Sequence, residues 1–162
     1  MTNAVFDKSF EVLMRVEGGY VDDPNDKGGK TKYGISQKSY PNIDIASLTK
    51  EEAKQIYYDD YWNRCKCRFL PDCLSLAVFD FAVNSGNKTA IKKLQSCLGV
   101  KVDGVIGNQT IGACNRLPLK KLLDDYFNER VDYLISLKDF KHFGKGWINR
   151  VNIVRKECED LI

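Results

Sequence analysis

The segment from residue 16 to residue 36, VEGGYVDDPNDKGGKTKYGIS, combines acidic side chains with turn-forming residues. Glu17 comes directly after the last apolar position of a helical pattern, and Asp26 and Thr31 follow nine and then five residues later. The glycines beside Glu17 let a ligand or another part of the chain come close. A hairpin that folds back over the helix end would bring these three side chains around one small volume.

Two carboxyl groups and a hydroxyl in such an arrangement suit glycoside hydrolysis. One carboxylic acid protonates the leaving oxygen, while a second carboxylate holds the attacking water or stabilises positive charge on the sugar. A glutamate half buried at a helix end is suited to the role of the acid. The alternative is that Glu17 is a solvated charge and that the aspartates only form turns, since Asp and Asn favour such loops. The residue types and spacing leave both interpretations open.

Apolar residues at helical spacing predict the elements that must position this segment. Residues 73–84 are apolar on nearly all sides, which predicts a central buried helix. Thr49 with Glu52 forms a capping-box pattern at the start of another helix. Residues 20–36 hold too many Gly, Pro and Asp residues for a helix and are expected to form a short irregular hairpin. The expected helices span residues 3–16, 50–63, 73–84, 88–98, 119–138 and 146–161, and VDGVIGNQT is expected to be a turn-rich connector. The fold class is therefore mostly α, with six to eight helices and one β-like excursion at about 20–36.

The composition limits the classes of partner. With 162 residues the chain suits one domain, or two small lobes that share a core. A net charge of +3 is too weak to indicate nucleic acid but is compatible with an anionic polymer such as a bacterial cell wall. No run of 18 apolar residues exists, so no membrane insertion is expected. Charged residues interrupt the first 19 positions, so we expect synthesis in the cytoplasm without a secretory signal.

Six cysteines invite a disulfide interpretation, but without a signal sequence we expect reduced thiols. Cys65, Cys67 and Cys73 could begin a zinc cluster. A tetrahedral site needs a fourth ligand, and the only histidine, His142, is distant in sequence. We therefore expect no metal and no cofactor.

Several motifs, in order along nearly the whole chain, resemble glycoside hydrolase family 108. EGGYVDDPNDKGGKTKYGIS is similar to the start of this family of bacteriophage and bacterial lysins, which carry a Glu-Gly-Gly-Tyr motif. YYDDYWNRC resembles the family's Tyr-Trp helix, and VFDFAVNSG resembles its buried helix. LQSCLGVKVDGVIGNQT and GWINRV resemble the predicted peptidoglycan-binding half that follows. The resemblance implies a lysozyme-like helical fold, with a catalytic region at 1–65 and a peptidoglycan-binding-like helical region at 66–162, packed as one compact unit.

The same resemblance implies an N-acetylmuramidase, a lysozyme-type endolysin of phage or prophage origin. The motif glutamate is Glu17. Its Glu-x8-Asp-x4-Thr spacing is similar to the Glu-x8-Asp-x5-Thr triad of phage-type lysozymes, which implies that Asp26 and Thr31 position the water. Tyr20 and Tyr33 are candidates for stacking on sugar rings, and Asn84 for a hydrogen bond to an N-acetyl group.

Each of these three binding candidates has a structural alternative. Tyr20 and Tyr33 could belong to the core. Trp62 could also stack on a sugar ring, but for Trp62 we prefer a position in the core. Asn84 could cap its helix or brace the hairpin instead of binding a sugar.

The implied partner is bacterial peptidoglycan, reached after release from the cytoplasm with the help of a holin, and the protein is expected to be a monomer. Two other functions compete with this one. The first is a non-catalytic cell-wall-binding or secretion-assisting protein that kept the fold. The second is a lytic transglycosylase, which also uses one glutamate but needs no water, so Asp26 and Thr31 would have no role in it.

Overall fold

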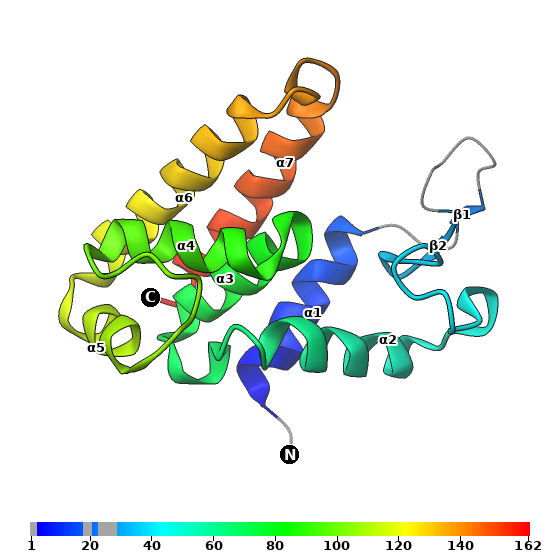
Figure 1. Cartoon of the computed structure of the whole chain (residues 1–162), viewed down its shortest axis with the longest axis horizontal. Coiled ribbons are helices and arrows are strands. Elements are labelled where there is room, and N and C mark those ends of the chain that lie inside the picture. Colours follow the sequence, from blue (N-terminus) through cyan, green and yellow to red (C-terminus); the bar gives the residue numbers. More distant parts are fainter. Residues whose placement is uncertain (1–2, 18–20, 23–28) are drawn as a thin grey trace.

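The computed structural model describes residues 3–17, 21–22 and 29–162. These residues form seven α-helices and a small three-stranded antiparallel sheet (Figure 1). The helices are α1 (Ala4–Val16), α2 (Lys50–Tyr57), α3 (Asp72–Ser85), α4 (Asn87–Leu98), α5 (Asn108–Arg116), α6 (Leu119–Ser136) and α7 (Phe140–Glu159). The strands are β1 (Val21–Asp22), β2 (Lys30–Lys32) and β3 (Ile35–Ser36). The predicted fold class, mostly α with a small β excursion, is confirmed.

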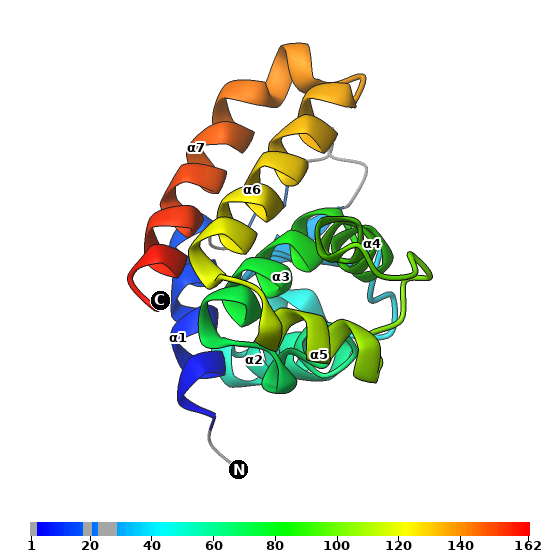
Figure 2. The ribbon, with the colours of Figure 1, turned by 90° about the vertical axis from the view of Figure 1, so that its left-hand side faces the viewer.

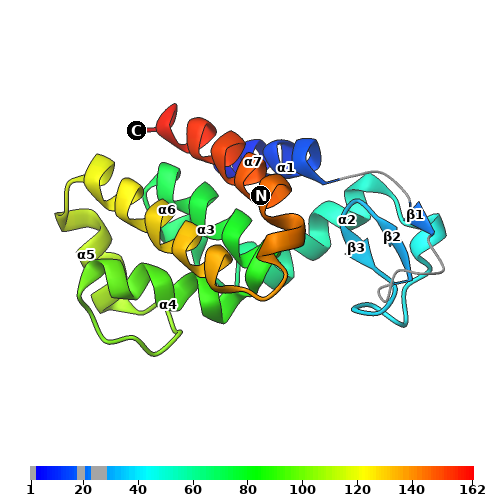
Figure 3. The same ribbon diagram turned by 90° about the horizontal axis from the view of Figure 1, so that it is seen from above.

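Helix α3 forms the centre of the molecule. Ten consecutive residues, from Cys73 to Ala82, are buried. Helices α1, α4, α6 and α7 all pack against α3, and Figures 2 and 3 show it between them. Apolar burial on every side explains the continuous apolar run, so the prediction of a central buried helix is confirmed.

Helix α1 carries Glu17 to its position. The Oδ1 atom of Asn3 accepts hydrogen bonds from the backbone N–H groups of Val5 and Phe6, which caps the start of the helix. Phe10 is buried on the inner face of the helix. Glu17 is the C-terminal cap, with an extended backbone (φ −94°, ψ 147°) and its N–H still bonded to a carbonyl of the last turn. The chain therefore leaves the helix at Glu17.

The small sheet brings a tight turn towards that helix end. Strands β1, β2 and β3 pair in this order, and Thr31 lies opposite Val21 on one side and Ser36 on the other. Tyr33 (φ 53°) and Gly34 (φ 80°) form the two-residue turn between β2 and β3. Positive φ at both central residues is the geometry that matches the twist of a two-residue hairpin.

Some predicted boundaries were wrong. The helix expected at 50–63 is α-helical only to Tyr57 and continues as a π-helical turn from Tyr58 to Trp62. The capping box at its start is present, since Thr49 and Glu52 bond each other's backbone N–H groups. The connector VDGVIGNQT ends in a helix, because α5 already begins at Asn108.

Helix α7 begins at Phe140, six residues earlier than expected. The sequence pattern placed its start at Gly146. Gly144 is instead buried within the helix, and the ring of Phe140 covers the space where a β-carbon would stand.

None of the helices in the described part of the chain is long and apolar enough to cross a membrane. All six cysteines are free thiols, and five of them are buried. The residues that the structure describes contain no group of three or more His, Cys, Asp or Glu side chains placed to hold a metal ion.

Candidate active site

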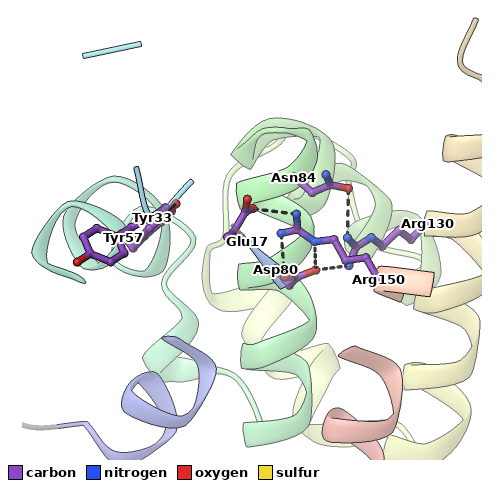
Figure 4. Close-up of polar contacts among 7 residues, drawn as sticks. All are labelled: Glu17, Tyr33, Tyr57, Asp80, Asn84, Arg130 and Arg150. Atoms are coloured by element: carbon purple, nitrogen blue, oxygen red, sulfur yellow. Dashed lines mark hydrogen bonds and ion pairs between the residues drawn. The ribbon is translucent and has the colours of Figure 1, made fainter. Parts of the chain in front are cut away.

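Glu17 lies at the end of α1 with its side chain only 21% exposed. Its Oε1 atom accepts a hydrogen bond of 2.9 Å from Nη1 of Arg150, which comes from α7 (Figure 4). These two residues are 133 positions apart in sequence. The fold thus places the glutamate of the Glu-Gly-Gly motif beside a cation from the last helix.

Gly34 closes the other side of Glu17. A β-carbon at Gly34 would lie 3.0 Å from both Cγ and Cδ of Glu17 and 2.5 Å from the hydroxyl oxygen of Tyr57. The hydroxyl of Tyr57 donates a 2.6 Å hydrogen bond to the carbonyl of Tyr33. The turn is therefore fastened to the helical body, and only a glycine leaves room for the Glu17 carboxyl group.

Asp80 of α3 lies behind Arg150 and is 1% exposed. Arg150 donates two hydrogen bonds to it, from Nε to Oδ2 (3.3 Å) and from Nη2 to Oδ1 (3.1 Å). Nη1 of the buried Arg130 forms an ion pair of 2.8 Å with Oδ2 of Asp80. Glu17, Asp80, Arg130 and Arg150 thus form a chain of two acids and two arginines, which we call the acid–arginine network.

The electrostatics around Asp80 and Arg150 favour the charged forms of these two residues. Burial by itself would raise the pKa of Asp80, but Arg130 and Arg150 outweigh it and lower the pKa below its ordinary value. Burial by itself would lower the pKa of Arg150, but Asp80 and Glu17 outweigh this effect and raise the pKa above its ordinary value. Arg150 is therefore a fixed positive charge between Asp80 and the carboxyl group of Glu17.

A cavity of about 160 Å³ opens beside Glu17. It is lined by Glu17, Gly34, Ile35, Ser36, Ser39, Tyr40, Tyr57, Tyr61 and Val83. Burial is the main cause that raises the pKa of the three tyrosines, so their hydroxyl groups stay protonated. One of them, that of Tyr40, donates a 2.6 Å hydrogen bond to Oδ2 of Asp60. The result is a small polar pocket with a carboxyl group at one wall and aromatic rings at the other.

A larger cavity of about 340 Å³ lies between α2 and the start of α1. It contains none of the residues predicted to do chemistry. Its lining also includes carboxyl groups, those of Asp7 and Glu51. The carboxyl group of Glu17 is only 21% exposed and is held by Arg150, which is a better indication of a reactive site than volume alone. The cavity beside Glu17 is therefore the candidate active site.

The other predicted site residues are placed as follows. Thr31 is half buried in the middle of β2. The turn residue Tyr33 has its ring beneath the ammonium group of Lys32, 5.7 Å from the ring centre. Within the described residues no hydrogen bond joins Thr31 to Glu17. Tyr20 and Asp26 lie outside the described residues.

Asn84 is half buried near the end of α3, and its Oδ1 accepts a 3.2 Å hydrogen bond from Nη2 of Arg130. Trp62 is 1% exposed and packs against Phe6 and Phe79, as preferred from the sequence. The catalytic roles of Asp26 and Thr31 and the sugar contacts of Tyr20, Tyr33 and Asn84 stay predictions.

The sequence interpretation missed Arg150 and Arg130, and it gave Asp80 no role. A signal for Asp80 exists, because it is the only charged residue within the apolar run LSLAVFDFAV. An aspartate in a buried helix needs a cationic partner. The sequence offers 25 lysines and arginines as partners, and nothing in the spacing selects two of them.

Comparisons with known proteins identify the family to which the chain belongs. Residues 10–86 match the protein family described as Glycosyl hydrolase 108, and residues 89–152 match the family described as Predicted Peptidoglycan domain. No curated protein sequence matches the chain significantly. Among solved structures, that of Brucella abortus SagA is 34% identical in sequence. The match covers 99% of this chain and 97% of that chain, with a TM-score of 0.89. The chain therefore belongs to glycosyl hydrolase family 108, a family of glycosidases that act on peptidoglycan.

Proposed function

We propose that this protein is an N-acetylmuramidase that hydrolyses the glycan strand of peptidoglycan with Glu17 as the general acid. The observation that carries this proposal is the position of Glu17 itself. Its carboxyl group is largely buried at a helix end, is held through one oxygen by Arg150, and lines the cavity beside the tyrosines.

The geometry supports a division of labour between the two oxygens of Glu17. Oε1 accepts the hydrogen bond from Arg150, and Oε2 has no hydrogen-bond partner within the described residues. In the proposed reaction Oε2 gives its proton to the glycosidic oxygen as the bond from that oxygen to the anomeric carbon breaks. General acid catalysis needs hydrogen-bond reach between the two atoms, and a fixed carboxyl group provides it.

The acid–arginine network supports this role by holding the carboxyl group in one place. Two of the hydrogen bonds of Arg150 go to Asp80, so its guanidinium group is anchored in the core and offers only Nη1 to Glu17. Arg130 holds Asp80 in turn. Glu17 is thereby positioned by residues of α3, α6 and α7 without being enclosed by them.

We propose that Asp26 takes a proton from the attacking water while Thr31 orients it, with inversion at the anomeric carbon. For an inverting enzyme the two carboxyl groups should be separated by roughly 6.5–9.5 Å, against about 5–5.5 Å for a retaining one. Asp26→Asn should then impair the reaction strongly, and Thr31→Ala less. A nearly active and normally folded Asp26→Asn enzyme would make Asp26 structural, and products of retained configuration would refute inversion.

The experiment that tests the proposed function is digestion of purified peptidoglycan followed by mass spectrometry of the soluble products. A muramidase adds water and leaves reducing N-acetylmuramic acid ends. A lytic transglycosylase would leave anhydro ends without added water, and a non-catalytic cell-wall-binding protein would release nothing. Only the first product set agrees with the proposal.

We further propose that the protein acts on the wall as a monomeric phage or prophage endolysin, after release from the cytoplasm with the help of a holin. Wild-type protein should clear a suspension of chloroform-treated Gram-negative cells, whereas Glu17→Gln should not. Elution from a size-exclusion column at the volume of a dimer would contradict the monomer.

A further inference from the structure

An aromatic cluster stands at the start of α7, outside the candidate active site. The ring of Phe143 stacks on that of Trp147 with 6.0 Å between centroids and an interplanar angle of 28°. The ring centroids of Phe140 and Trp147 are 6.2 Å apart, with the two rings tilted by 50°. Phe143 is 58% exposed, while Phe140 and Trp147 are half buried. We call Phe140, Phe143 and Trp147 the aromatic cluster.

The cluster is supported from beneath. A β-carbon at Gly144 would lie 2.8 Å from the ring of Phe140, so the glycine is what lets this ring lie against the helix. Phe140 then supports Trp147, and Trp147 supports Phe143. Single exposed apolar side chains are ordinary on protein surfaces. A group of three neighbouring rings, one pair of them stacked, with a glycine beneath it is a more organised feature than that.

The aromatic cluster lies on the same helix, α7, as Arg150, which donates a hydrogen bond to Glu17. Phe143 and Trp147 precede Arg150 by seven and three residues on the same helix, which places all three on one face. At about 1.5 Å of rise per residue, Phe143 lies about 10 Å from Arg150 along the helix axis. On this face Arg150 contacts Asp80 of α3 and Glu17.

Figures 1 and 2 show the α6–α7 hairpin projecting beyond α3. The face that Arg150 turns towards the candidate active site therefore continues to the aromatic cluster where α3 no longer covers it.

The charged residues around the aromatic cluster indicate what kind of partner the cluster could bind. The segment KDFKHFGK, residues 138–145, contains three lysines and one aspartate. Lys138, Lys141 and Lys145 are all exposed. A glycan strand of peptidoglycan offers both matching chemistries, because its pyranose rings have apolar C–H faces and its stem peptides carry carboxylates. Aromatic faces suit the former, and ammonium groups suit the latter.

We propose that the aromatic cluster is a binding subsite for the glycan strand of peptidoglycan, on which a sugar several rings away from the cleaved bond stacks against Phe143. This inference rests on the proposed function, because it assigns the strand a path from Glu17 along α7. With this subsite the enzyme binds long strands more tightly than it does through the small pocket beside Glu17 alone. Lys141 and Lys145 add attraction for the stem peptides.

The experiment measures co-sedimentation with purified insoluble peptidoglycan, with every protein carrying Glu17→Gln so that the strand stays intact. Phe143→Ala should weaken binding about 5–10-fold, the change that partial burial of one aromatic side chain gives. Phe143→Tyr should bind like the parent, because the ring is kept. Phe69→Ala is the matched control, since Phe69 is a similarly exposed aromatic residue (47%) that lies outside the aromatic cluster. Because Phe143 is exposed, its replacement should not affect folding, which the thermal midpoint checks.

Binding of Phe143→Ala within about twofold of Phe69→Ala would overturn the proposal. A second arm uses vesicles of phosphatidylglycerol and phosphatidylcholine. If Phe143→Ala loses vesicle binding but keeps peptidoglycan binding, the cluster contacts lipid and the proposal is also overturned. Failure of the muramidase assignment looks different: wild-type protein then releases no sugar, whereas the binding loss of Phe143→Ala persists.

Discussion

Because Gly34 has no β-carbon, it leaves room for the carboxyl group of Glu17. Replacing it by alanine places a β-carbon 2.5 Å from the Tyr57 hydroxyl and 3.0 Å from two carbons of Glu17, at a φ of 80°. We expect Gly34→Ala to lower kcat by about 10²-fold, since a shift of about 1 Å in a catalytic group has that effect. The rate of reducing-end release from peptidoglycan measures it.

Gly99→Ala is the control for Gly34→Ala. Gly99 also has a positive φ (69°), but nothing lies within 4 Å of where its β-carbon would stand. Both variants should lose roughly 1–2 kcal/mol of unfolding free energy from the left-handed backbone. Only Gly34→Ala should also lose enzymatic activity. Equal activity in the two variants would show that Gly34 has no part in positioning Glu17.

Asp80 should make stability depend on pH. Its pKa is lowered in the folded protein, so it contributes stability above the unfolded pKa of about 3.9. This contribution is lost as the pH falls through the folded pKa. We expect Asp80→Asn to cost about 3–5 kcal/mol near neutral pH, because it removes the carboxylate that the buried Arg130 and the largely buried Arg150 share. The variant should also lose less stability than wild type below about pH 4. Thermal unfolding followed at a series of pH values measures both effects.

The control for Asp80→Asn is Asp124→Asn. Asp124 also pairs with two cations, Lys120 and Arg155, but its side chain is 35% exposed. Solvent screening should limit its loss to about 1 kcal/mol or less. Similar losses in the two variants would contradict the importance given to the buried network.

At the residue scale, the sequence identified Glu17 as a candidate site residue but did not predict which residues contact it. The end of an apolar helical pattern and the glycines after it singled out Glu17 as the candidate acid. Arg150 could not be predicted, because a contact between residues 133 positions apart depends on how α1, α3 and α7 pack. Gly34 looked like an ordinary turn glycine, since its contacts with Glu17 and Tyr57 appear only in three dimensions.

At the scale of elements, Gln95 organises the connection between α4 and α5. Its buried side-chain amide donates to Asp103, to the carbonyl of Val105 and to Thr110. Its Oε1 accepts from the backbone N–H groups of Asp103 and Gly104. The Asp-Gly and Thr residues of VDGVIGNQT therefore have the structural role that the sequence suggested.

Replacing Gln95 by leucine should remove this support. The unpaired backbone and side-chain groups should each lose part of their hydrogen-bond free energy, for a total of about 2–4 kcal/mol. Chemical denaturation measures the change. Gln55→Leu is the control, because Gln55 is exposed and bonds only Asp59 within the described residues. A loss no larger than that of the control would contradict this role for Gln95.

Element boundaries were predictable where local chemistry determines them and unreliable elsewhere. The capping box at Thr49 and the apolar run of α3 depend on neighbouring residues, and both were read correctly. The sequence predicted the start of α7 six residues too far along the chain. Gly144 lies within the helix with the ring of Phe140 packed over it, and a propensity pattern does not show this contact.

At the scale of the whole molecule, the two family matches share one core. Helix α3 lies in the first match, and its partners α4, α6 and α7 lie mainly in the second. A single cluster of buried apolar residues runs from Phe6 to Cys158. We therefore expect one cooperative unfolding transition, with coincident curves from circular dichroism and tryptophan fluorescence. Two separate transitions would show that the halves fold independently.

The central claim is that Glu17 is the general acid, and the most direct test is the rate of reducing-end release from purified peptidoglycan by Glu17→Gln. Glutamine has nearly the same shape and can still accept a hydrogen bond from Arg150, but it cannot give a proton to the leaving oxygen. We predict a loss of about 10²–10⁴-fold with an unchanged circular dichroism spectrum. Activity within a few-fold of wild type would remove Glu17 from the mechanism.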